Sequence, residues 1–156
     1  MTYPLDLRVN GVRYSTAVEP HQSLLDVLRR QLGVTGPKEG CDDSECGACM
    51  VLVDGGPVNS CCLLALQAAG QDVTTVEGIA DSHVGARLSA RMLEEGGVQC
   101  GFCTPGIMVM AAALLTAEPN PDEQRIRNAL AGNLCRCTGY QKIVSAVAKA
   151  AADLNK

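Results

Sequence analysis

Hydrophobic and polar residues alternate at the start of the chain, as they do in a strand with one buried face. Apolar residues occupy every second position from Leu5 to Val9, and the alternation returns from Val12 to Val18. Between these runs stands Asn10-Gly11, a pair favoured in the type I′ turn of a two-residue hairpin. The first segment therefore predicts a β-hairpin.

A helical pattern follows the hairpin, and two further strand patterns follow the helix. Ser23 stands where an N-cap is expected, with Asp26 three residues later, and Gly33 marks the end of the helix. Leucines form its inner face, at positions 24, 25, 28 and 32. The stretch "MVLVDGGPVNS" predicts a second hairpin that turns at Gly55-Gly56, and "DVTTVEG" predicts a final short strand. A sheet crossed by one helix predicts a β-grasp arrangement.

From about Ser82 the apolar residues recur with a helical period, and four short helices are predicted. The first ends at Gly96-Gly97, and the second begins at Thr104-Pro105. The third is capped by Asn120-Pro121 with Glu123 and ends at Gly132. The fourth begins with a capping box of Thr138 and Gln141. The second helix, "GIMVMAAALL", is apolar on all sides, which predicts burial. We expect a small helical bundle, with a domain boundary near residues 76–82 that divides the chain into 1–78 and 79–156.

Composition excludes several classes of function. The chain of 156 residues has a formal net charge of −4 and only 3% aromatic residues, so it lacks the basic surface and stacking side chains of nucleic-acid binders. Hydrophobic residues make up 47%, which allows a packed core and also an apolar surface covered by a partner. No run of about 18 or more apolar residues is present, so we expect no membrane span.

Nine cysteines are the most unusual feature of the composition. The N-terminus "MTYPLDLRVNG" has neither a basic segment followed by an apolar one nor a twin-arginine pair, so we expect a cytoplasmic protein. Disulfides are scarce in that reducing compartment, and clustered cysteines there more often bind metal. An odd count also fits poorly with a fully paired disulfide framework.

The first group of cysteines has the spacing C-x4-C-x2-C, with a fourth member eleven residues further on. Its members are Cys41, Cys46, Cys49 and Cys61. This is the spacing of plant-type [2Fe–2S] ferredoxins, whereas structural zinc sites more commonly use two short Cys or His pairs. On residue spacing alone, Cys62 could be the fourth ligand in place of Cys61. We favour Cys61 as the ligand and expect Cys62 to be a small buried hydrophobic residue.

The loop around these cysteines also contains glycines and acidic residues. Gly40 and Gly47 predict a close approach of the backbone to the sulfur atoms, so that N–H groups can donate to them. Asp42, Asp43 and Glu45 could lower a reduction potential or form a solvated face, and we favour the solvated face.

The second group stands directly before two predicted helices. Cys100 and Cys103 form "CGFC" before one helix, and Cys135 and Cys137 form "CRC" before the other. Helix N-termini favour negative charge, as four thiolates would supply. A thioredoxin-type dithiol requires a preceding strand, and a helix precedes here. Spacing leaves zinc, [2Fe–2S] and [4Fe–4S] open for this group.

Four ordered motifs together resemble the small iron–sulfur subunit of the molybdenum hydroxylases, the xanthine oxidase family. They are "GCDDSECGACMVLVDGGPVNSC", "TTVEGIA", "QCGFCTPG" and "NLCRCTGY", and they span nearly the whole chain. The resemblance implies an α+β fold, with an N-terminal β-grasp ferredoxin-like [2Fe–2S] domain followed by a C-terminal four-helix bundle with a second [2Fe–2S] cluster. It assigns Cys100, Cys103, Cys135 and Cys137 to that second cluster.

The resemblance also implies partners. The second cluster would lie beside the molybdopterin cofactor of a large subunit, with Gln99 hydrogen-bonded to the pterin and Cys137 closest to it. The first cluster would face FAD on a medium subunit. Since the chain stops at Lys156, we expect both cofactors on separate chains, in a dimer of heterotrimers. Met50, Pro37 and Ser44 depart from the family pattern, but none is an expected ligand.

These expectations describe an electron-transfer subunit of an oxidoreductase without a substrate site of its own. Electrons would pass from molybdenum to the second cluster, then to the first, then to FAD. We expect the second cluster to be buried in the bundle, with its motif residues at the interface with the large subunit. His21 and His83 are expected at the surface. The alternative is a free-standing two-cluster ferredoxin, which the apolar helix and modest charge disfavour.

Overall fold

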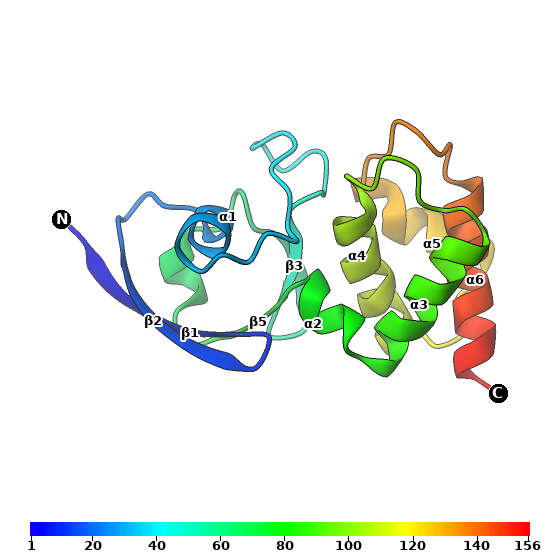
Figure 1. Ribbon diagram of the computed structural model, residues 1–156, viewed down its shortest axis with the longest axis horizontal. Helices are drawn as coiled ribbons and strands as arrows, with labels where there is room; N and C mark the ends of the chain where they lie inside the picture. The colour runs from blue at the N-terminus through cyan, green and yellow to red at the C-terminus, as the bar shows by residue number, and fades with distance from the viewer.

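The computed structural model describes residues 1–156 and has a sheet half and a helical half side by side (Figure 1). The elements, in chain order, are β1 (Tyr3–Val9), β2 (Val12–Val18), α1 (Leu24–Asp26), a π-helical turn (Val27–Gln31), β3 (Met50–Val53), β4 (Gly56–Asn59), a 3-10 turn (Ala65–Ala68), β5 (Asp72–Thr74), α2 (Val76–Ala80), α3 (His83–Glu94), α4 (Thr104–Ala117), α5 (Glu123–Ala129), a 3-10 turn (Leu130–Gly132) and α6 (Gln141–Leu154). None of the helices has the length and apolar character needed to cross a bilayer.

The N-terminal half is a five-stranded mixed sheet in the order β2-β1-β5-β3-β4. The predicted first hairpin is confirmed, with Asn10 and Gly11 at φ values of +51° and +81°. Its alternation places Leu5, Leu7 and Val9 in a core with Leu24 of α1 and Leu28 of the π-helical turn. Ser23 is the predicted N-cap and accepts from the Asp26 N–H at 3.1 Å. After one α-turn the helix widens into the π-helical turn, a change that the leucine pattern did not predict.

The second hairpin turns one residue earlier than predicted. Asp54 and Gly55 have φ values of +47° and +82°, and Gly56 already begins β4. The predicted Gly55-Gly56 turn is therefore wrong, because Asp54 tolerates the left-handed conformation that a two-residue turn requires. The predicted final strand is confirmed as β5, which pairs in parallel with β1 and antiparallel with β3.

The helical half consists of α3, α4, α5 and α6, preceded by the short α2, which was not predicted. The central helix α4 is buried along most of its length, as its apolar sequence predicts. Two predicted caps are wrong. Asp122 caps α5 in place of Asn120 and accepts from the Arg125 N–H at 2.7 Å. The N-cap of α6 is Tyr140, and no capping box forms, because Thr138 bonds within the preceding loop.

The two halves share a packed boundary. Helix α4 contacts β3 and β4, and Met50 of β3 belongs to the core of the helical half. In Figure 1 the loop that leads into β3, drawn in cyan, rises on the side of the sheet that faces the helical half. The loops that carry the cysteines are therefore close to this boundary.

Candidate metal-binding cysteine sites

The β3–β4 hairpin brings together two cysteines of the first group. Met50 and Asn59 are paired at the open end of the hairpin. Cys49 and Cys61 lie just beyond this pair, and both are buried, with 2% and 8% exposure. Cys41 and Cys46 come from the loop before β3 and are half-buried. The fold thus gathers four thiols from one loop and one distant segment, as the spacing predicts.

Close pairs connect these four thiols. Burial, followed by the neighbouring Cys49 thiol, raises the pKa of Cys61. Burial also raises the pKa of Cys46, with further contributions from the Cys41 and Cys49 thiols. No three potential ligands converge on one point. A [2Fe–2S] cluster needs two thiolates on each of its irons, which a pairwise arrangement supplies.

Cys62 does not occupy the buried position expected for it. Its side chain is exposed, and its Sγ lies 3.7 Å from that of Cys61. The chain turns here, with the Cys62 N–H donating to the Asn59 carbonyl at 3.2 Å. Because of this turn, Cys61 points inward to Cys49 and Cys62 points to solvent, which favours Cys61 as the member of the group.

Backbone N–H groups point at the sulfur atoms of the first group. The Cys46 N–H donates to Cys41 Sγ at 3.3 Å, and the Ser44 and Ala48 N–H groups donate to Cys61 and Cys46. At Gly40 a Cβ atom would lie 2.8 Å from Cys46 Sγ, so the predicted close approach holds there. Such donors stabilise thiolates and the negative charge of a bound cluster.

The acidic residues of the loop are all exposed, in agreement with a solvated face. One of them contacts a thiol of the group. The Asp43 carboxylate interacts with the Cys41 thiol, and this hydrogen bond holds the pKa of Asp43 below its ordinary value. The same carboxylate raises the pKa of Cys41, but N–H donation from Asp43 and Cys46 outweighs it and the net shift is downward.

The second group is assembled from the two loops that precede α4 and α6. Cys100 Sγ lies 3.5 Å from Cys137 Sγ. Burial, followed by the neighbouring Cys135 thiol, raises the pKa of Cys103 to about 12. The four thiols therefore form two pairs side by side. Cys103 and Cys135 are half-buried, but Cys100 and Cys137 are exposed, so the expected burial of the whole group within the bundle is wrong.

Cys135 has the most elaborate hydrogen-bonding environment of the second group. The Thr138 hydroxyl donates to Cys135 Sγ at 3.1 Å. Burial raises the pKa of Cys135, but hydrogen bonds from the Thr138 hydroxyl and N–H outweigh it, so the net shift is downward. These hydrogen bonds stabilise negative charge on the Cys135 sulfur.

The two groups are joined by backbone contacts that the sequence did not predict. The Leu134 N–H donates to the Cys46 carbonyl at 2.9 Å, and the Asn133 side chain donates to the Gly47 carbonyl at 3.0 Å. At Gly47, with φ of +68°, a Cβ atom would lie 2.3 Å from the Gly132 carbonyl oxygen. Leu134 directly precedes Cys135 of the second group. The bond from its N–H therefore links the second group to Cys46 of the first group.

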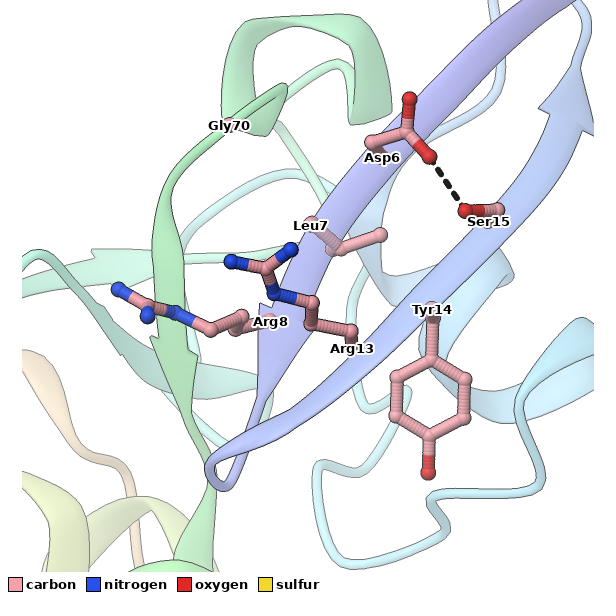
Figure 2. Close-up of a pocket in the computed structure, with 7 residues that line it drawn as sticks. All are labelled: Asp6, Leu7, Arg8, Arg13, Tyr14, Ser15 and Gly70. Carbon is pink, nitrogen blue, oxygen red and sulfur yellow. Dashed lines mark hydrogen bonds between the residues drawn. The ribbon is translucent and has the colours of Figure 1, made fainter.

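The other predicted residues lie at the surface. Gln99 is exposed beside Cys100, and His21 and His83 are exposed as expected. A separate hollow of about 460 Å³ lies over the first hairpin and is lined by residues of β1 and β2 and by Gly70. Figure 2 shows its lining, in which Asp6 bonds to Ser15 and two arginines are adjacent. Arg8 pairs with Asp72, and no cysteine is present, so this hollow is distinct from the thiol groups.

Comparison with known proteins identifies the same two regions. Residues 7–80 match the family model of the 2Fe-2S iron-sulfur cluster binding domain, and residues 75–148 match that of the [2Fe-2S] binding domain. The nicotinate dehydrogenase small FeS subunit of Eubacterium barkeri is 48% identical over 143 residues, which cover 92% of this chain and 91% of that protein.

Two further relatives are similar over almost their full length. The xanthine dehydrogenase iron-sulfur-binding subunit of Escherichia coli O157:H7 is 42% identical over 94% of this chain and 92% of that one. The crystal structure of quinoline 2-oxidoreductase from Pseudomonas putida 86 contains a chain that superposes with a TM-score of 0.92 at 38% identity. That match covers 97% of this chain and 94% of the other.

Proposed function

Since this chain belongs to the family of small iron–sulfur subunits of the molybdenum hydroxylases, we propose which residues hold its two clusters. One cluster is held by the first thiol group, Cys41, Cys46, Cys49 and Cys61, and the other by the second group, Cys100, Cys103, Cys135 and Cys137. The observation that carries this assignment is the gathering of eight cysteines into two groups of paired thiols, with the ninth, Cys62, exposed to solvent beside the buried Cys61.

The donor set fits [2Fe–2S] clusters. Each group supplies four thiols, the ligand type and number that such a cluster takes. The first group adds N–H donors to its sulfur atoms and a glycine where a Cβ would meet Cys46 Sγ. The second adds the Thr138 hydroxyl at Cys135. Both arrangements favour negative charge on sulfur.

The chain is the electron-transfer subunit of an oxidoreductase complex and has no substrate site of its own. Its two clusters, when bound, take up and release single electrons between the molybdopterin centre of a large subunit and FAD on a medium subunit. The contact between Leu134 and Cys46 supports direct transfer between the two clusters. We propose that the second group receives electrons and the first passes them on. The relatives are subunits of larger enzymes, so the free-standing carrier is not favoured.

We assign the fold more finely on the same basis. Residues 1–78 form a β-grasp ferredoxin-like domain, supported by the five-stranded mixed sheet with α1 packed on its core. Residues 79–156 form a four-helix bundle of α3, α4, α5 and α6, supported by their shared core. The overlap of the two family matches at residues 75–80 is consistent with this boundary.

The large subunit is proposed to cover the exposed side of the second thiol group. Cys100 and Cys137 are exposed, and so are Phe102 and Leu134, at 48% and 56%. Exposed apolar side chains around a redox site are typical of a surface that a partner covers. Gln99, exposed beside them, is proposed to bond to the pterin, with Cys137 nearest to it. The complete assembly is proposed to be a cytoplasmic dimer of heterotrimers.

The Thr138 hydroxyl is expected to raise the reduction potential of the second cluster. A hydrogen bond to a ligand sulfur is stronger when the cluster carries the additional electron, so it favours the reduced state. Thr138→Val should lower the potential on the order of 40 mV, for a bond worth about 1 kcal/mol more in the reduced state. An EPR-monitored redox titration measures this shift. Thr138→Ser, which keeps the hydroxyl, should retain the native potential, and equal potentials in all three proteins would contradict the role.

Co-purification tests the subunit assignment. A tagged chain expressed with the genes of its complex should elute together with a molybdopterin-containing subunit and a FAD-containing subunit. Metal and flavin analysis of the eluate should then find iron, molybdenum and FAD together. Recovery of a stable monomer that holds iron but is free of molybdenum and flavin would instead support the free-standing carrier.

A further inference from the structure

Tyr140 has a backbone conformation that is unfavourable for a residue with a side chain. It is the N-cap residue directly before α6 and lies in the left-handed region, with φ of +68°, after Gly139 at φ of +66°. Residues in this region are retained where their surroundings hold them, and they cluster at functional sites. The side chain of Tyr140 is half-buried, and its ring lies with Leu130 and Val144 at the base of the second cysteine loop.

The Tyr140 hydroxyl bridges the backbone on both sides of one residue. It accepts from the Cys135 N–H at 2.7 Å and donates to the Asn133 carbonyl at 2.8 Å. Between these two anchored groups lies Leu134. Both bonds have good lengths, and together they fix the direction in which the Leu134 peptide points.

Leu134 and Asn133 make the contacts that join the two thiol groups. The Leu134 N–H donates to the Cys46 carbonyl, and the Asn133 amide donates to the Gly47 carbonyl. Asn133 is only 1% exposed, and its side-chain oxygen has no hydrogen-bond partner, so its placement depends on the surrounding backbone. The Tyr140 hydroxyl, at the start of α6, is the side-chain group that hydrogen-bonds to the backbone of residues 133–135 and restrains it.

We propose that the Tyr140 hydroxyl is a positioning group for electron transfer between the two clusters, a role that rests on the cluster residues proposed above. It ligates no iron. It holds residues 133–135 so that the Leu134 N–H meets the Cys46 carbonyl, and it thereby fixes how the second thiol group lies against the first. Without the hydroxyl, the Cys135 N–H and the Asn133 carbonyl lose their shared partner, and the Leu134 contact becomes intermittent.

Tyr140→Phe isolates the hydroxyl, because the ring and its apolar neighbours are kept. The matched control is Tyr14→Phe, which removes the same atom from β2 (Figure 2), the edge strand on the side of the sheet opposite the β3–β4 hairpin. Both variants are to be studied in the assembled complex. Iron content, the EPR spectrum after full reduction and hydrogen–deuterium exchange of the peptide around Leu134 are measured for each.

Tyr140→Phe should retain the native iron content and the signals of both clusters. Exchange of the Leu134 amide should become faster by roughly two- to tenfold, as expected for the weakening of one hydrogen-bonded contact. The magnetic interaction between the two reduced clusters, visible as splitting of their EPR signals, should decrease or broaden, and FAD reduction in a single turnover should be slower. Tyr14→Phe should match the wild type in every measurement.

Two results would overturn the proposal. Native exchange, native EPR splitting and a native rate of FAD reduction in Tyr140→Phe would show that the hydroxyl does not position the contact. Loss of either cluster would show that it is needed for cluster binding itself. The cluster assignment fails in a different way, because the wild-type complex would then lack the second cluster signal.

Discussion

Replacing Cys49 by serine is expected to remove half of the iron from the chain and nearly abolish FAD reduction, while a single oxidation of substrate at molybdenum remains possible. Cys49 is 2% exposed and pairs with Cys61. Without its sulfur the first group has three thiols, one fewer than a [2Fe–2S] cluster takes. The second group lies on other loops and keeps all four of its thiols. Rapid mixing of the variant complex with substrate, followed by flavin absorbance, measures the effect.

Cys62→Ser is the matched control for this variant. Cys62 lies next to Cys61, with the two Sγ atoms 3.7 Å apart, but its side chain is exposed whereas that of Cys61 is buried. We expect this variant to retain all of its iron and the native rate of FAD reduction. A native rate in Cys49→Ser would show that electrons reach FAD without the first cluster. Loss of iron from Cys62→Ser would show that Cys62, and not Cys61, is the fourth ligand of the first cluster.

Gly47→Ala is expected to disturb the packing between the two halves of the chain where the first cysteine loop meets residues 132–133. A Cβ atom at this position would lie 2.3 Å from the Gly132 carbonyl oxygen and 2.6 Å from the side-chain nitrogen Nδ2 of Asn133. Gly47 also has a positive φ, of +68°. The left-handed backbone costs about 1–2 kcal/mol with a side chain, and the overlap costs about 1–3 kcal/mol more. We expect the thermal unfolding midpoint of the complex to fall by roughly 5–15 °C.

Gly55→Ala separates these two causes. Gly55 also has a positive φ, of +82°, but a Cβ atom there would meet nothing within 4 Å. This control should show the backbone effect alone, a decrease of a few degrees in the thermal unfolding midpoint. Equal decreases in both variants would mean that the close approach between the halves contributes nothing to stability.

Local signals in the sequence predicted much of this structure. The Asn10-Gly11 pair fixed the first hairpin, since the turn type depends on two residues. The cysteine spacing and the four motifs predicted two thiol groups, because ligands on one loop are constrained by chain length. Ser23 was correctly predicted as the N-cap of α1, because a cap bonds to a backbone group only three residues away.

Features that depend on distant segments were not predicted. The bond from Leu134 to Cys46 joins residues that are far apart in sequence, and no pattern in either loop identifies the other. The role of Thr138 was predicted as a helix cap, because its hydroxyl has the right spacing to Gln141, but the Cys135 sulfur is the acceptor in the folded chain. The orientation of Cys62 likewise depends on a turn whose direction only the β3–β4 register sets.

The most direct test of the account is iron quantitation combined with EPR of the dithionite-reduced complex. Eight cysteines in two groups predict about four irons per copy of this chain and two distinguishable cluster signals. About two irons with a single signal, or zinc in place of iron in the second group, would contradict it.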